Sequence, residues 1–322
     1  MGLLFEYNVS IMGKEGQKVD NVYRRIREEM NHPDQVESSV AFLTEKIGAF
    51  LKKRERVLIC LPDTPGGVGW TIGQAVERCE GIPIFLGEDR RWKTMIRTAF
   101  SSRCGTIVAE PLVLLGLSKL AKNMGVPLFI RDAILAGYPC MPWMRDGMQV
   151  GLDCRTYGCF DPMGLIAGFI SHGERILYLR NDLFDGCTLD AEGSVLPDGS
   201  MGAVAVSWAD APEDRLVIGY QGRITHTTRE NGSPAIALSD VSLGSSLEPD
   251  IAQLSGHLHR WTSILDCRVT RGNYGLELEI VTFPGEKLPK LPSCAKQVVR
   301  PWDPETEIPF GVLFEEKPWE NH

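Results

Sequence analysis

The sequence predicts an α/β protein: a layered α/β domain with a β-rich subdomain, followed by a small α+β domain. In the first half of the chain, short runs of β-branched and apolar residues alternate with segments of helical periodicity. This alternation is typical of a layer of parallel strands covered by helices. After about Gly164 the pattern changes to short alternating segments separated by Asp-Gly and Glu-Gly pairs. Because Asp-Gly is a strong signal for a hairpin turn, this part is expected to be rich in β-structure.

Periodicity and boundary residues predict the elements of the first half. Helical spacing of apolar residues indicates helices at 19–30 and 40–51, with a break at Pro33 and a cap at Ser38 or Ser39. The remaining elements alternate regularly along the chain. Strands are expected at 56–61, 82–86, 105–109 and 129–136, and helices at 71–78, 92–102 and 111–123.

The second half is predicted to contain short strands at 168–179, 187–195 and 202–208. Turns are expected at Asp185-Gly186, Glu192-Gly193 and Asp198-Gly199. A helix at 249–261 and strands at 264–270 and 276–283 then predict a small α+β unit, and the last 38 residues are expected to form an extended tail. We therefore expect a large domain at 1–236 and a small C-terminal domain with its tail at 237–322.

Composition limits the classes of function. With 43% hydrophobic and 24% charged residues, the 322-residue chain resembles an ordinary globular enzyme. Its net charge of -8 and the lack of a long basic run argue against binding of nucleic acid or an anionic membrane. No apolar run is long enough to span a membrane, and no signal peptide is recognisable. The nine scattered cysteines include no Cys-x-x-Cys pair, which favours a reducing, cytoplasmic compartment over a disulfide framework or a zinc site.

The most informative motif is Tyr157-Gly158-Cys159-Phe160-Asp161. It resembles Tyr-Gly-x-Thr-Glu, the adenine- and phosphate-contacting motif of the adenylate-forming acyl- and aryl-CoA ligases, with two residues changed. Other segments resemble that family in the same order, and the similarity is closest to the phenylacetate–CoA ligase branch. These segments are 136–139, 198–204, 216–220, 244–249 and 288–293, and the resemblance extends from about residue 10 to about residue 300.

The resemblance implies a chemistry as well as a fold. It implies ATP or AMP and Mg²⁺ as cofactors, CoA as an acceptor, a small carboxylic acid as substrate and pairing into a homodimer. The residues that it assigns to nucleotide and acid binding are Gly137, Tyr138, Pro139, Tyr157, Gly158, Asp161 and Tyr220. Asp161 would also hold Mg²⁺, and Lys296 would be the catalytic lysine that neutralises charge as the carboxylate attacks the α-phosphate. The C-terminal domain would be mobile, and the large domain would be shortened at its N-terminal end relative to the family.

Several positions depart from the family pattern. In the candidate phosphate loop at 10–18, Lys14 and Glu15 replace hydroxyl residues, and a glutamate there repels a triphosphate. Phe160 replaces the threonine and offers no hydrogen bond, and no aspartate for the ribose follows Tyr220. Lys287 and Lys290 compete with Lys296 as the C-terminal lysine.

Structural roles also compete with functional ones at the motif itself. Asp161 could cap a helix before Pro162, and Tyr157-Gly158 could form a turn. Two functions therefore stay open. One is a divergent ligase that activates an acid as an acyl adenylate, and the other is a catalytically inactive pseudoenzyme that binds a ligand or a partner.

Overall fold

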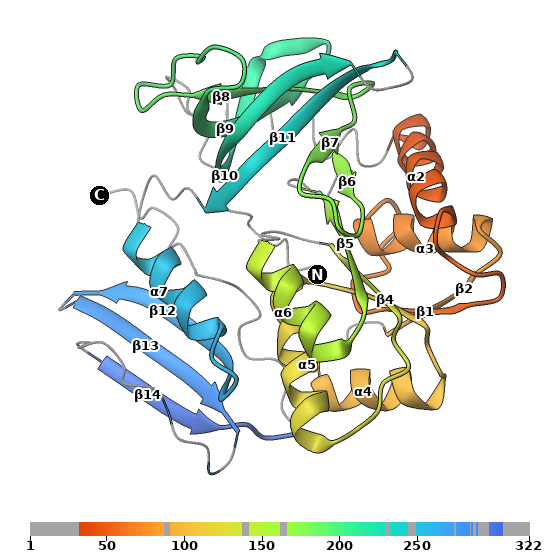
Figure 1. Ribbon diagram of the computed structural model, residues 1–322, viewed down its shortest axis with the longest axis vertical. Coiled ribbons are helices and arrows are strands. Elements are labelled where there is room, and N and C mark those ends of the chain that lie inside the picture. The colour runs from red at the N-terminus through yellow and green to blue at the C-terminus, as the bar shows by residue number, and fades with distance from the viewer. Residues whose placement is uncertain are drawn as a thin grey trace.

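The computed structural model describes residues 32–86, 91–136, 142–161, 166–228, 232–243, 249–273, 275–283, 285, 288 and 296–304. Within these residues the chain forms one large mixed sheet of eleven strands and a separate sheet of three strands (Figure 1). The expected architecture, a layered α/β part with a β-rich part and a small α+β unit, is confirmed. The helix expected at 19–30 lies outside the described residues.

Five parallel strands form one half of the large sheet, in the order β2-β1-β3-β4-β5. They are β1 (Arg56–Ile59), β2 (Ile82–Phe85), β3 (Thr106–Ala109), β4 (Asp132–Leu135) and β5 (Arg155–Phe160). Most of their side chains are buried, because helices cover both faces of this layer. The helices are α2 (Pro33–Gly48) and α3 (Val68–Arg78) on one face, and α4 (Trp92–Ser101), α5 (Pro111–Met124) and α6 (Pro142–Leu152) on the other.

The start of α2 differs from the prediction. Pro33 opens this helix, because the first helical position needs no amide hydrogen and suits the fixed φ of proline. Ser38 and Ser39 consequently lie inside α2 rather than at its cap. The buried Ser39 hydroxyl instead accepts a hydrogen bond from Arg180, at 2.8 Å.

The β-rich part continues the same sheet. Strand β6 (Gly168–Ile170) pairs antiparallel with β5, and the order then runs β6-β7-β11-β10-β9-β8. The other bounds are β7 (Leu177–Leu179), β8 (Phe184–Leu189), β9 (Met201–Trp208), β10 (Ala211–Thr228) and β11 (Pro234–Leu243). Turns at Gly193 and Gly199 are confirmed, with φ of +82° and +77°. The turn predicted at Asp185-Gly186 is wrong, since both residues lie within β8, where Gly186 lets Ile224 pack closely.

The small unit consists of α7 (Pro249–His259), β12 (Ile264–Gly272), β13 (Gly275–Thr282) and β14 (Lys296–Pro301). It has a core of its own around Leu258 and Ile280, but Leu265, Val281 and Phe283 belong to the core of the large layer. The boundary expected between residues 236 and 237 falls inside β11, which pairs with β10 and β7, so the small unit begins after β11. The expected tail contains β14, which pairs in parallel with β13.

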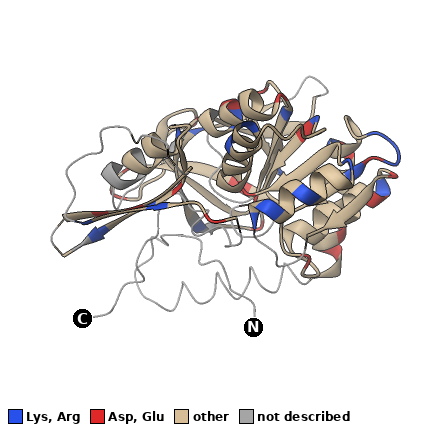
Figure 2. Cartoon of the chain, turned by 90° about the horizontal axis from the view of Figure 1, so that it is seen from below, with Lys and Arg blue, Asp and Glu red and all other residues tan. Residues whose placement is uncertain are grey.

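Charge is spread over the surface of the large layer. Figure 2 shows basic and acidic residues interspersed along its helices. No helix in the described part of the chain is long and apolar enough to cross a membrane.

Candidate functional site

A cavity of about 500 Å³ extends along β5, from Thr156 to Asp161, between α6 and strands of the β-rich part. Its volume lies within the ~300–1,000 Å³ that small-molecule sites commonly occupy. The rings of Phe160 and Tyr220, with centroids 6.0 Å apart, contribute to its apolar wall. The charged residues of the lining are Arg145, Asp146, Asp161, Glu174, Arg175 and Asp240. In open α/β sheets, ligands commonly bind at the carboxyl ends of the strands, and Phe160 and Asp161 line the cavity at that end of β5.

Three of the residues predicted for the site meet in this cavity, although they come from different parts of the chain. Gly158 belongs to β5, Asp161 follows the end of that strand, and Tyr220 belongs to β10. Asp161 is 2% exposed and Tyr220 is 3% exposed. The predicted turn of Gly137, Tyr138 and Pro139 lies outside the described residues.

Tyr157 lies on the other face of the sheet. Side chains alternate along a strand, so Tyr157 and its neighbour Gly158 face opposite ways. The Tyr157 ring stacks on that of Phe50, with centroids 3.9 Å apart and planes 14° apart. Burial and the nearby carboxylate of Asp132 raise the pKa of Tyr157 to about 12. In this structure the ring is therefore part of the core under α2 and α3 and does not line the cavity.

Lys296 is likewise separate from the cavity. It is the first residue of β14, the edge strand of the three-stranded sheet, where its position pairs with Glu277. Its side chain is exposed and is not part of the cavity lining. The competing Lys287 and Lys290 lie outside the described residues.

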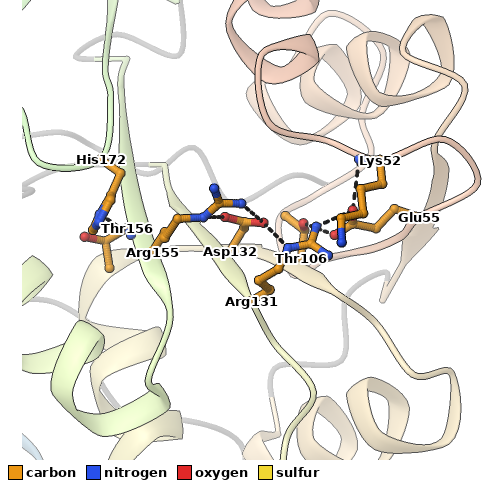
Figure 3. A network of polar contacts seen from close by, with 8 residues as sticks. All are labelled: Lys52, Glu55, Thr106, Arg131, Asp132, Arg155, Thr156 and His172. Carbon is orange, nitrogen blue, oxygen red and sulfur yellow. Dashed lines mark hydrogen bonds and ion pairs between the residues drawn. The ribbon is translucent and has the colours of Figure 1, made fainter.

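A polar network that the sequence analysis missed joins the amino ends of the parallel strands (Figure 3). Glu55 accepts hydrogen bonds from the Thr106 hydroxyl at 2.7 Å and from Arg131 at 2.5 Å. Asp132 accepts from Arg131 at 3.0 Å and from Arg155 at 2.7 and 2.9 Å. The recurrence of charged residues just before or at the start of successive strands was the signal in the sequence.

This network lowers the pKa of Glu55. Burial alone would raise the pKa of Glu55, but hydrogen bonds from Thr106, the Lys52 amide and Arg131 hold it below its usual value. Glu55, Thr106, Arg131, Asp132 and Arg155 lie at the amino ends of the strands and are not part of the cavity lining, so we assign the network a structural role.

Among the residues that the structure describes, the acidic side chains do not form a metal cluster of their own. Over the described residues, no group of three or more His, Cys, Asp and Glu side chains lies where it could hold a metal ion. Proteins often bind Mg²⁺ through one or two carboxylates together with nucleotide phosphates. Asp161 therefore fits the chemistry of Mg²⁺ in combination with a bound nucleotide.

Comparisons with known proteins identify the fold. Neither a protein-family model nor a curated protein matches the sequence. Among solved structures, a 2-hydroxyisobutyryl-CoA ligase in the postadenylation state is similar, with a TM-score of 0.60 and 11% identity over 88% of this chain and 69% of the ligase. A benzoate CoA ligase from Burkholderia xenovorans has a TM-score of 0.54 and 11% identity over 82% of this chain and 62% of its own. The amide bond synthetase McbA from Marinactinospora thermotolerans has a TM-score of 0.50 and 13% identity, over 81% and 61%.

The protein therefore has the fold of the adenylate-forming acyl- and aryl-CoA ligases. At 11–13% identity, the similarity establishes the fold alone. The chain spans less than two thirds of the length of the benzoate CoA ligase and of the amide bond synthetase.

Proposed function

We propose that this protein binds a small carboxylic acid in the cavity beside β5, and that its adenylation fold serves as a binding scaffold without adenylation chemistry. One observation carries the proposal: Gly158, Asp161 and Tyr220 line one cavity, and Phe160 adds an aromatic ring to it at the motif position of the threonine. A phenyl ring cannot donate a hydrogen bond to phosphate, but it packs well against the apolar part of an organic acid.

The positions of two other residues support binding over turnover. Tyr157 is stacked on Phe50 on the opposite face of β5, and Lys296 is exposed on β14. A hydrogen bond to a charged group contributes about 1.5–3 kcal/mol of binding free energy. The missing contacts to a triphosphate would therefore lower the affinity for ATP strongly. The similar structures include ligases named for 2-hydroxyisobutyryl and benzoate groups, which suggests short or aromatic acids as probes.

The second candidate is a divergent AMP-forming acyl- or aryl-CoA ligase of the phenylacetate–CoA ligase type. The buried carboxylate of Asp161, in the cavity at the end of β5, favours it. In that function Asp161 would hold Mg²⁺ beside the phosphates of ATP, and CoA would accept the acyl group. Lys296 would act only if the small unit carried it from its exposed position to the cavity.

Thermal unfolding with separate ligands distinguishes the two candidates, because a ligand that binds the folded state raises the melting temperature. Benzoate, phenylacetate and 2-hydroxyisobutyrate are the acid probes, and Mg·ATP, AMP and CoA are tested alone and with each acid. The binding function predicts a shift with at least one acid, none with Mg·ATP, and no release of pyrophosphate. Acid-dependent pyrophosphate release that Asp161→Asn abolishes would establish the ligase instead. If none of these ligands shifted the melting temperature, both candidate functions would be refuted.

We further propose that the protein acts in the cytoplasm, where thiols stay reduced. The seven cysteines in the described part of the chain are free, which supports this location. A homodimer is also proposed from the family resemblance. Light scattering on the purified protein tests it, and a monomer at micromolar concentration would exclude a stable dimer.

A further inference from the structure

The turn between β6 and β7 closes one side of the cavity. Its residues Gly173, Glu174 and Arg175 line the cavity together with residues of β10 and of β11, the strand with which β7 pairs. Gly173 has a φ of +80°, a conformation that glycine adopts without strain. The amide of Ser171 donates to the Glu174 carboxylate at 3.0 Å, and the Glu174 amide donates back to the Ser171 carbonyl at 3.2 Å. The turn is therefore ordered by its own hydrogen bonds.

Two neighbouring elements fix the turn from outside. Arg145, on α6, donates to the carbonyl oxygens of Ser171 and Glu174, each at 3.1 Å. The main-chain amide of Thr156, on β5, donates to Nδ1 of His172 at 3.3 Å (Figure 3). The buried Nε of Arg145 has no hydrogen-bond partner among the described residues, so this guanidinium is oriented by the turn alone. Both terminal nitrogens of Arg145 thus hold main chain of the turn.

The other charged residues of the lining differ in whether they already have a partner. Asp240 pairs with Arg223 at 3.0 Å, and Glu174 accepts from the Ser171 amide. Arg175 is exposed at the cavity and has no hydrogen bond or ion pair with any residue that the structure describes. Because the lining also contains acidic residues, a carboxylate can bind there only where a cation offsets their repulsion.

We propose that Arg175 binds the carboxylate of the acid, and that Arg145 is a positioning residue that presents Arg175 by holding the β6–β7 turn. This inference rests on the function proposed above and names the group that recognises the acid. The planar guanidinium of arginine matches a carboxylate with two parallel hydrogen bonds, which a lysine cannot reproduce. The apolar wall around Phe160 and Tyr220 then receives the rest of the acid.

Calorimetric titration with an acid and its neutral amide tests the role of Arg175. Benzoate and benzamide have nearly the same shape but differ in charge at neutral pH. The wild-type protein is expected to bind benzoate more tightly than benzamide. Arg175→Gln should weaken benzoate binding about tenfold or more and leave benzamide binding nearly unchanged, because only the charge-assisted contact is lost. Arg97→Gln is the matched control, since Arg97 is exposed on α4 away from the cavity and its replacement changes the net charge equally.

The outcomes separate this inference from the proposed function. If the wild-type protein binds benzoate and Arg175→Gln binds it equally well, the role of Arg175 is overturned and the binding function stands. If the wild-type protein binds none of benzoate, phenylacetate and 2-hydroxyisobutyrate, the binding function is refuted, and the role of Arg175 is refuted with it.

A double-mutant cycle tests the role of Arg145. Arg145→Met should weaken benzoate binding and speed hydrogen exchange at residues 171–175, but should add little to the effect of Arg175→Gln, because both changes remove the same contact. Independent, additive effects of the two substitutions would overturn the positioning role. Circular dichroism checks that each variant is folded.

Discussion

The Nζ atom of Lys119, on α5, lies 2.6 Å from the carbonyl oxygen of His259 and 2.6 Å from that of Ile264. These two carbonyls lie at the end of α7 and the start of β12, so one side chain of the large layer holds the turn of the small unit. Nearby, the Arg260 guanidinium lies 5.2 Å from the centroid of the Trp143 ring on α6. Figure 1 shows the small unit beside α5 and α6, as these contacts require.

Lys119→Met is expected to loosen the small unit. The change leaves two carbonyl oxygens without their donor, which should lower the free energy of unfolding by about 1–3 kcal/mol. Because burial already disfavours the ammonium and lowers the pKa of Lys119 to about 8, the lower part of this range is expected. Chemical denaturation measures the change, and hydrogen exchange should speed up at residues 259–264. Lys122→Met, at an exposed position of the same helix, is the control. Equal effects of the two substitutions would contradict the assigned role.

Asp132→Asn should be one of the most destabilising conservative changes in the parallel layer. It removes the charge that faces Arg131 and Arg155, whose side chains are 36% and 43% exposed. Because those arginines keep contact with water, the free energy of unfolding should fall by about 2–3 kcal/mol. This loss is smaller than the full cost of breaking a buried ion pair. Urea denaturation compares this variant with Glu80→Gln, which breaks the exposed pair with Lys53 and should change stability by less than about 1 kcal/mol. Similar losses in the two variants would show that the network stabilises the fold no more than an exposed ion pair does.

His226 gives the β-rich part a dependence on pH. Hydrogen bonds to Asp185 and Asp198 raise the pKa of His226 above its usual value. The folded state therefore binds the proton more tightly than the unfolded state, and the stabilisation is complete below about pH 6.5 and lost as pH rises through the raised pKa. Because the imidazole is 51% exposed, the effect should stay below about 1 kcal/mol.

Urea denaturation at about pH 6 and about pH 9 measures this contribution. His226→Gln should lower stability at the acidic pH and have less effect at the alkaline pH. The control is His257→Gln on α7, where the imidazole accepts a hydrogen bond from Trp261. A loss of stability in His226→Gln that is the same at both pH values would contradict the linkage.

Tyr157 is expected to behave as a core residue. Tyr157→Ala removes a ring that is 5% exposed and should cost about 3–5 kcal/mol, whereas Phe129→Ala, at a site 58% exposed, should cost far less. Tyr157→Phe keeps the stack on Phe50 and should leave the affinity for benzoate unchanged in a calorimetric titration. A tenfold loss of affinity for benzoate or Mg·ATP in Tyr157→Phe would show that the hydroxyl reaches a ligand after all.

Much of the parallel layer could be predicted because strands buried on both faces appear as continuous apolar runs. The strand at 56–59 and the helix at 111–124 follow the sequence pattern closely. The failures have local causes that depend on tertiary packing. Gly186 lies in a strand because β8 pairs with β9 there, and β14 pairs with the edge of β13. Neither neighbour could be identified from the sequence near these residues.

The candidate site was only partly predictable. The motif at 157–161 lies along the cavity, and Asp161 lines it. The motif could not show which side chain faces the cavity, because a shift of one residue in a strand exchanges its two faces. Arg145 and Arg175 were missed because they match no motif. The hydrogen bonds from Arg145 to the β6–β7 turn, which carries Arg175, form only after α6 packs beside that turn.

The interior of the large layer includes Leu265, Val281 and Phe283 from the small unit. Removing that unit would therefore uncover apolar surface on what remains, and heat or denaturant should melt the whole protein in one cooperative step. A gene fragment that ends after β11 should consequently yield an aggregating product rather than an independent domain.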